Sequence, residues 1–175
     1  VIWFFRWMAF RVMFGAGLIK LRGAPCWTDL TCLAYHYETQ PIPNPLSWYL
    51  HHLPLWFHGI GALWNHFVEL FVPFFMFGPR LVRRVGGVLL VTFQAMLILR
   101  GNLSFLNWLT IFICFAMFDD GFLRRFVFER IGRRIDSLGA GLPPGPGRRL
   151  VIGSLAVTLV CLSWQPVVNM LSPNQ

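Results

Sequence analysis

IGALWNHFVELFVPFFMFG, residues Ile60–Gly78, is the stretch that decides the fold. Its nineteen residues carry one charged side chain, that of Glu69. An α-helix needs about 20 predominantly apolar residues to span the hydrocarbon core of a bilayer. The segment is therefore predicted to cross a membrane.

The composition of the whole chain supports this interpretation. Of its 175 residues 56% are hydrophobic and 13% are charged, and the mean hydropathy is +0.59. Soluble domains contain about 25% charged residues, so this chain has too little charge for the surface of a soluble fold. With 18 Phe and 8 Trp it is also too apolar for a disordered segment. We expect an all-α, multi-pass transmembrane helical bundle.

Five apolar segments predict about five transmembrane helices. They are Val1–Leu21, Ile60–Gly78, Val85–Leu99, Leu103–Phe118 and a last helix within residues 150–175. The third and fourth are short, and they need flanking residues, snorkelling arginines or local thinning of the bilayer to cross it. Alternatively, one of these two is a re-entrant or buried helix.

The basic residues predict the orientation. The chain has 15 Lys and Arg against 7 Asp and Glu, for a net charge of +8. Ten arginines fall in the two loops that five crossings place on one side: Arg80, Arg83, Arg84, Arg124, Arg125, Arg130, Arg133, Arg134, Arg148 and Arg149. The positive-inside rule assigns that side to the cytoplasm. A nucleic-acid surface would need these arginines on one soluble face, so we expect membrane lipid and no nucleic acid as a partner.

Three regions follow from these assignments. Residues 1–120 form a membrane core with an outer loop over residues 22–59, residues 121–149 form a basic, Gly/Pro-rich cytoplasmic loop, and residues 150–175 hold the last transmembrane helix. The chain begins with Val1 inside an apolar run, so we expect it to be part of a longer protein. We expect that longer protein to be an integral membrane protein.

The outer loop carries Cys26 and Cys32, which face an oxidising compartment on this topology. A disulfide between them is predicted, with two free thiols as the alternative. The proline-rich stretch Pro41–Pro45 cannot be helical. The aromatic stretch Leu46–Phe57 follows, and it predicts a short interfacial helix broken at Pro54. A glycosylation sequon at Asn102 lies too close to the bilayer for use.

Polar residues within the spans are the candidates for chemistry. His66 and Glu69 lie three residues apart and share a helical face, which suits a metal, a proton relay or a polar ligand. The alternative is a structural pair in which Arg11 or Arg6 neutralises Glu69. Gln94 and Asn107 are expected to bond between helices.

Other features predict structural roles. Gly86-Gly87 and Gly15-x-Gly17 suit close helix approach, and Asp119 suits a helix start or a pair with Arg124 or Arg125. One His-x-x-Glu supplies too few ligands for a metal, and no phosphate loop or nucleophile elbow appears. We therefore expect no metal, no cofactor and no catalytic residue.

Several ordered motifs resemble the lipase maturation factor family. They are FGAGLIK (14–20), CW (26–27), DLTC (29–32), YHYETQPIPNP (35–45), YLHHLP (49–54), NHFVEL (65–70) and GNLSFLNWLT (101–110), ending at FDD (118–120). The resemblance covers roughly residues 14–120. Within it, the outer-loop candidates are Tyr35, His36, Tyr37, Glu38, Thr39, Gln40, His51 and His52.

The resemblance implies a multi-pass folding factor that helps secreted lipases fold and assemble into active dimers, with lipases as clients. It also implies a large lumenal C-terminal domain, which this sequence does not contain. The location is the endoplasmic reticulum membrane in a eukaryote, or the inner membrane in a bacterium. Two alternatives remain: an integral-membrane enzyme using intramembrane His and Glu, and a small transporter.

Overall fold

The structure is a computed structural model that describes residues 2–40, 44–101, 105–126 and 145–171. These residues contain helices and no strand, so the all-α prediction is confirmed for the described part of the chain. The chain divides into two compact units, Ile2–Leu123 and Arg124–Gln175, the second including Val1. Each unit is considered by itself.

Among the described residues, four helices are long and apolar enough to cross a membrane. In the first unit they are α1 (Ile2–Arg22), the continuous run Leu55–Phe77 and α6 (Arg80–Arg100). In the second unit the span Pro146–Pro166 lies within α10 (Pro146–Leu171). The prediction of a multi-pass helical bundle is confirmed.

The fourth predicted span, Leu103–Phe118, is shorter in the structure than the others. Helix α7 (Phe105–Cys114) has 10 residues, and a 3-10 turn, η3 (Phe115–Met117), adds 3. At about 1.5 Å per residue this run is shorter than a hydrocarbon core of about 30 Å. The alternative of a buried helix in this region fits α7, since its Asn107, Thr110, Ile113 and Cys114 are buried.

Two predicted boundaries differ from the structure because of proline and arginine. The second span begins at Leu55, five residues before the predicted Ile60, because extended Pro54 precedes it and helix follows at once. The predicted interfacial helix is accordingly shorter, α4 (Pro45–His51). The prediction that Pro45 is not helical is wrong, because proline is tolerated in the first turn of a helix. Helix α6 starts at Arg80, before the predicted Val85, since arginine is a good helix former and continues the helix beyond the apolar run.

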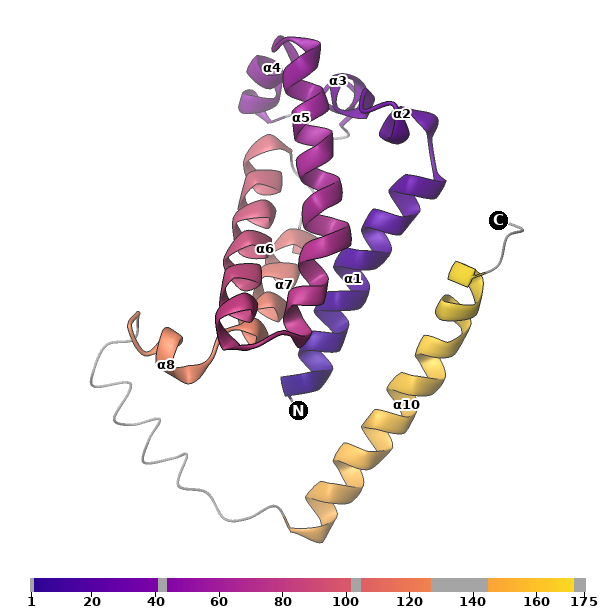
Figure 1. Ribbon diagram of the computed structural model, residues 1–175, viewed down its shortest axis with the longest axis vertical. Helices are drawn as coiled ribbons and strands as arrows, with labels where there is room; N and C mark the ends of the chain where they lie inside the picture. The colour runs from indigo at the N-terminus through magenta and orange to yellow at the C-terminus, as the bar shows by residue number, and fades with distance from the viewer. Residues whose placement is uncertain (1, 41–43, 102–104, 127–144, 172–175) are drawn as a thin grey trace. The chain divides into compact units, whose positions relative to one another are not determined.

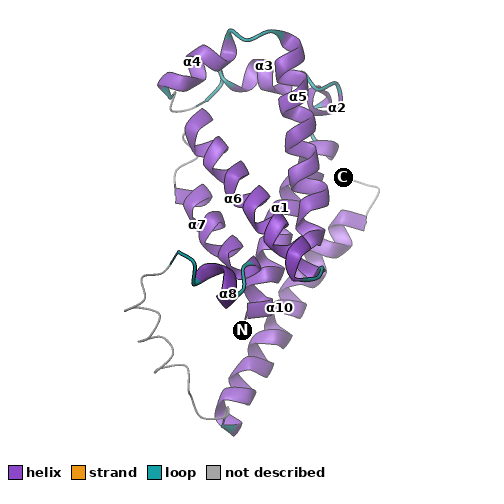
Figure 2. Ribbon diagram, turned by 60° about the vertical axis from the view of Figure 1, so that its left-hand side comes forward, coloured by secondary structure: helices purple, strands orange, loops and turns teal. Residues whose placement is uncertain are grey.

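The first unit has two distinct ends (Figures 1 and 2). Three short helices lie at one end: α2 (Pro25–Thr28), α3 (Cys32–His36) and α4. We call residues 23–54 the outer segment. The start of α1, the start of α6 and the short helix α8 (Asp120–Leu123) lie at the opposite end. The sequon at Asn102, residues 41–43 of the proline-rich stretch and residues 127–144 of the basic loop lie outside the described residues.

The core of the first unit lies between α1, the second span, α6 and α7. Its buried members are Ala9, Met13, Val68, Val72, Met76, Leu90, Phe93, Ile113, Cys114 and Met117. A smaller apolar cluster of Leu33, Tyr37 and Ala62 joins the outer segment to the second span.

Glycines permit the closest helix contacts, as predicted for Gly86-Gly87. A Cβ at Gly86 would lie 2.8 Å from Phe75 Cβ, and one at Gly87 would lie 2.8 Å from the Phe118 ring. In the Gly15-x-Gly17 pair the prediction is right only for Gly17, which packs against Leu70 and Glu69. A Cβ at Gly15 would meet nothing within 4 Å.

Replacing Gly86 by alanine should destabilise the bundle. The new methyl group meets the Cβ of Phe75, which cannot move by rotation about χ1, and overpacking of this kind costs about 1–3 kcal/mol. Gly15→Ala is the matched control, because it adds the same methyl group in open space and gains helix propensity. Thermal unfolding of the purified protein in detergent should show a lower Tm for Gly86→Ala only; equal Tm values would contradict this packing.

Candidate functional site

A buried ion pair joins the first two spans. Lys20 Nζ of α1 lies 2.5 Å from Glu69 Oε1, and the Glu69 side chain is 4% exposed. Asn65 completes the cluster: its Nδ2 donates to Glu69 Oε2 at 3.0 Å, and its Oδ1 accepts from Lys20 Nζ at 3.1 Å. Both carboxylate oxygens are therefore engaged, and the predicted partners Arg11 and Arg6 are wrong: the cation is Lys20.

Proline explains how the helix presents Glu69 to Lys20. Pro73 has no backbone N–H, and its ring clashes with the carbonyl four residues earlier, that of Glu69. The helix responds with a π turn, η1 (Phe67–Phe71), in which Val72 N donates to Phe67 O, followed by the 3-10 turn η2 (Val72–Phe77). Gly17 lets η1 approach α1 closely enough for the ion pair.

His66 faces a different partner from Glu69. Its Nε2 lies 3.0 Å from the carbonyl oxygen of Trp27, to which it donates, and its Nδ1 is buried with no partner. The predicted His66–Glu69 structural pair is therefore wrong, because each side chain takes another partner: His66 the Trp27 carbonyl, and Glu69 the Lys20 and Asn65 side chains.

The Trp27 contact ties the cysteine turn to the bundle. Cys26 and Cys32 lie at disulfide distance, with their Cα atoms 4.7 Å apart, as expected. Between them Leu30 adopts φ of 59°, and Thr31 N donates to Cys26 O at 2.9 Å. The Trp27 ring lies 5.0 Å from Lys20 Nζ, a cation–π contact. The turn thus contacts the buried ion pair through Lys20 and the second span through His66.

The other intramembrane candidates lie apart from this cluster in their contacts. Gln94 Nε2 donates to Met13 Sδ at 3.2 Å, which links α6 to α1, while its Oε1 is buried without a partner. Asn107 is 3% exposed and its Nδ2 has no partner. Arg11 is half-buried in α1. Gln94 and Asn107 therefore do not join Glu69 in one intramembrane site.

The outer-segment motif does come together, around the last turn of α6. Ser47 Oγ donates to the Arg100 carbonyl, and Gln40 Nε2 also reaches it at 3.4 Å. Asn44 Nδ2 donates to Ile98 O at 3.4 Å, while its Oδ1 caps α4 by accepting from Leu46 N at 3.0 Å. The last carbonyls of a helix lack partners within it, and here the outer segment supplies them.

Gly101 makes this cap possible. A Cβ at this position would lie 2.6 Å from Gln40 Nε2, so the amide can sit on the helix end only against glycine. Gln40 Nε2 also lies 3.0 Å from His36 Nε2 and donates a hydrogen bond to this ring nitrogen. Burial, with the positive charges of Lys20 and Arg100, lowers the pKa of His36 and favours this neutral form.

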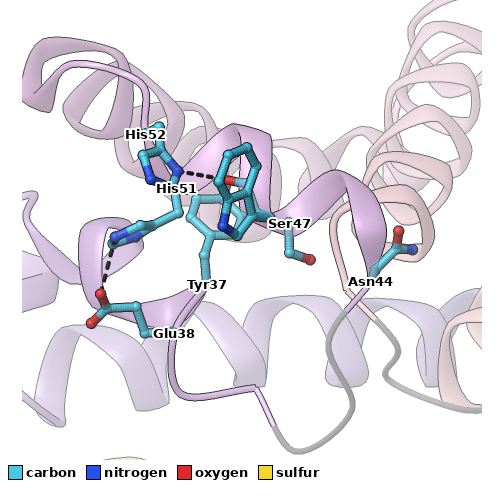
Figure 3. A pocket seen from close by; sticks show the side chains of 7 residues that line it. Tyr37, Glu38, Asn44, Ser47, His51 and His52 are labelled. Atoms are coloured by element: carbon cyan, nitrogen blue, oxygen red, sulfur yellow. Dashed lines mark hydrogen bonds and ion pairs between the residues drawn. The ribbon is translucent and has the colours of Figure 1, made fainter.

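Beside the cap lies an open pocket of about 350 Å³ (Figure 3). Its lining residues are Tyr37, Glu38, Asn44, Ser47, Trp48, His51 and His52. His51 bridges Glu38 Oε1 at 3.0 Å and the Ala34 carbonyl at 3.2 Å. Burial raises the pKa of Tyr37, so its phenol stays protonated.

Three large aromatic side chains are exposed on α4, where Trp48 lines the pocket, and at the start of α5 (Leu55–His66). Trp48 is 63%, Tyr49 66% and Trp56 66% exposed. We call these three the aromatic rim. Of the remaining predicted motif residues, Tyr35 is exposed, and Thr39 Oγ1 donates to the Tyr35 carbonyl at 3.1 Å. Among the described residues, no three His, Cys, Asp or Glu side chains are grouped as metal ligands.

Some residues of the Lys20–Glu69 cluster and of the cap on α6 were not predicted from the sequence. Charge alone places Lys20 at the membrane edge, although its spacing of three from Gly17 places both on the face that packs on η1. Asn65 and Ser47 are ordinary polar residues whose roles depend on contacts across the fold, and no local signal distinguishes them.

Comparison with known proteins decides the family. The model of the lipase maturation factor transmembrane domain matches residues 1–125. This chain belongs to the lipase maturation factor family. The lipase maturation factor match thus extends beyond both ends of the expected 14–120 region.

Individual relatives extend the match further. The chain is 50% identical over 187 residues to lipase maturation factor 1 of Homo sapiens, covering 100% of this chain and 33% of the relative. It is 50% identical over 189 residues to that of Mus musculus, with the same coverage. It is 42% identical over 120 residues to lipase maturation factor 2 of Xenopus tropicalis, covering 67% of this chain and 17% of the relative.

The chain spans about a third of the length of the lipase maturation factor 1 relatives. No solved structure matches it. Because the family model is that of a transmembrane domain and the helices are long and apolar enough, the chain is part of an integral membrane protein.

Removing the cation of the buried pair should destabilise this lipase maturation factor domain. Lys20→Met leaves the Glu69 carboxylate buried without a counter-charge. Breaking a fully buried ion pair lowers the free energy of unfolding by about 3 kcal/mol. The loss here should be smaller, because the Lys20 side chain is partly exposed and water screens its charge. Lys20→Met/Glu69→Gln should recover most of the loss, since the introduced amide is neutral and its oxygen still accepts from Asn65. A double-mutant cycle on thermal stability measures the coupling, and additive losses would contradict it.

Acidification should loosen the outer segment through His36. Its folded-state pKa lies below the ordinary value of 6.5, so the unfolded chain binds more protons as the pH falls through that value. The stability contribution is present above pH 6.5 and is lost on acidification. Tm measured from pH 7.5 to about 5.5 should fall less in His36→Gln than in wild type.

His52→Gln is the control for this pH series, because His52 is exposed and bonds only the Trp48 carbonyl of its own helix. It should keep the wild-type slope. A His36→Gln variant with the wild-type slope would show that His36 does not carry the effect.

Proposed function

We propose that the protein assists the folding, assembly and secretion of lipases as a non-catalytic maturation factor of the endoplasmic reticulum membrane. The observation that carries the proposal is 50% identity over the whole chain to relatives named lipase maturation factor 1. Because the chain spans a third of those relatives, the client and its contact with the whole protein are both part of the proposal.

The outer segment is the proposed side of client contact. A cysteine pair at disulfide distance fits an oxidising compartment such as the reticulum lumen. The same segment carries the pocket beside α4 and most of the aromatic rim. Tyr and Trp provide large contact areas at low cost in side-chain entropy, which suits binding to a partly folded protein surface.

The contacts of His66 and Glu69 give the enzyme alternative no advantage. An acid–base pair needs the two groups within reach of one substrate, whereas Glu69 is held by Lys20 and Asn65, and His66 is held by Trp27. These bonds stabilise the bundle. The transporter alternative likewise gains no supporting observation from the described residues.

Deleting the gene should lower secreted lipase activity while lipase synthesis continues. Complementation with the full-length protein should restore activity, and the Trp48→Ala/Tyr49→Ala variant should restore it only partly. Trp108→Ala is the matched control, since Trp108 is 63% exposed on α7, outside the outer segment. The measurements are lipase activity in the medium and lipase dimers on a sizing column.

Unchanged activity with normal dimers after deletion would overturn the proposed function. Full rescue by Trp48→Ala/Tyr49→Ala would instead show that the aromatic rim does not contact the client. The proposed maturation role would then still stand.

A further inference from the structure

Two arginines meet at the end of the first unit that lies opposite the outer segment. Arg6 Nε of α1 donates to the Ala116 carbonyl at 2.9 Å, and Arg83 Nε of α6 donates to the Met117 carbonyl at 3.0 Å. The two guanidinium groups thus hold neighbouring carbonyls where α7 and η3 end. Their charges repel each other.

Neither arginine has a carboxylate partner among the described residues. The acid nearest in sequence to these carbonyls, Asp119, is held by Arg84 through two hydrogen bonds, Nε to Oδ1 at 2.7 Å and Nη2 to Oδ2 at 2.6 Å. Arg84 is therefore a partner of Asp119 that the sequence did not predict. The bond to Arg84 lowers the pKa of Asp119 to about 2, so this carboxylate stays charged and committed.

Capping the helix end does not balance the two charges. The carbonyl end of a helix carries roughly half a negative charge, against two full positive charges on Arg6 and Arg83. Arg6 is only 6% exposed, so water compensates its charge poorly. The excess positive charge at this end therefore favours the approach of an anion.

The donors for such an anion are available. Each guanidinium uses Nε for its carbonyl. Arg83 is only half-buried, so its terminal nitrogens are the accessible donors, while Arg6, at 6% exposed, contributes mainly its charge. Forked guanidinium groups bind phosphate oxygens through paired hydrogen bonds.

The surroundings indicate where the phosphate comes from. The Trp3 ring lies 4.9 Å from the Arg6 guanidinium carbon and stacks on Phe77 with centroids 6.5 Å apart. Trp3 is 57% exposed, and tryptophan at the end of a spanning helix is typical of the headgroup layer. We propose that Arg6 and Arg83 form a binding site for the phosphate of an anionic lipid headgroup.

The test uses the full-length protein in a neutral detergent, with three probes. These are short-chain phosphatidylglycerol, short-chain phosphatidylcholine and inorganic phosphate, each titrated while Tm and bound lipid by native mass spectrometry are measured. Phosphatidylglycerol should raise Tm and be retained, and phosphatidylcholine should do so at least about tenfold more weakly. Stabilisation by ligand follows from preferential binding to the folded state.

The variants distinguish binding at Arg6 and Arg83 from non-specific attraction to the positive charge at this end of the first unit. Arg83→Gln should weaken phosphatidylglycerol binding about tenfold. Arg80→Gln, the matched control, removes the same charge at an exposed position one turn earlier in α6 and should change binding less than about twofold. If Arg83→Gln does not fold, Arg83→Lys and Arg6→Lys keep the charge, lose the guanidinium fork and should still weaken binding.

Each outcome decides the proposal. Selective loss in Arg83→Gln supports the lipid site, whereas binding of inorganic phosphate with equal affinity would assign the same phosphate chemistry to a soluble ligand and overturn the lipid assignment. Equal losses in Arg80→Gln and Arg83→Gln, full binding by the folded lysine variants, or no preference for phosphatidylglycerol would overturn it as well.

Discussion

The ion pair between Lys20 and Glu69 is the constraint on which the first unit depends. A carboxylate that is almost fully buried must either lose its charge or keep a cation beside it. This requirement fixes the distance and register between α1 and the second span. Gly17 provides the close approach, and the π turn before Pro73 turns Glu69 toward the lysine. The same lysine contacts Trp27, so the register of two spans also determines where the cysteine turn begins.

The outer segment takes its shape from the helix ends beneath it. Its helices have 4, 5 and 7 residues. Helices this short are not stable by themselves in water. They are held in place because Gln40, Asn44 and Ser47 donate hydrogen bonds to the last carbonyl groups of α6. In addition, His66 of the second span donates a hydrogen bond to the Trp27 carbonyl. The pocket and the aromatic rim are thus supported by the bundle, although they lie outside it.

The sequence predicts the helices well and their contacts poorly, for a physical reason. Apolarity over about 20 residues reflects the solvent of each segment, so the spans at Ile2–Arg22 and Arg80–Arg100 follow from composition. The cysteine pair is close in sequence and is equally accessible to prediction. Partners such as Lys20 with Glu69 depend on helix register. Here Glu69 pairs with a lysine 49 residues earlier and His66 with a backbone carbonyl 39 residues earlier, contacts that no local pattern contains.

The distribution of occupied and available groups indicates how the molecule works. In the bundle, the polar groups that resemble catalytic residues hold one another or the backbone: Glu69, Asn65 and His66 among them. At the two ends of the first unit other groups are accessible, as aromatic faces on the outer segment and as the Arg83 guanidinium at the start of α6. Aromatic faces bind by contact area, and guanidinium groups bind by charge and geometry. Both modes suit binding, in keeping with the client contact proposed for the outer segment and the headgroup site proposed at the opposite end.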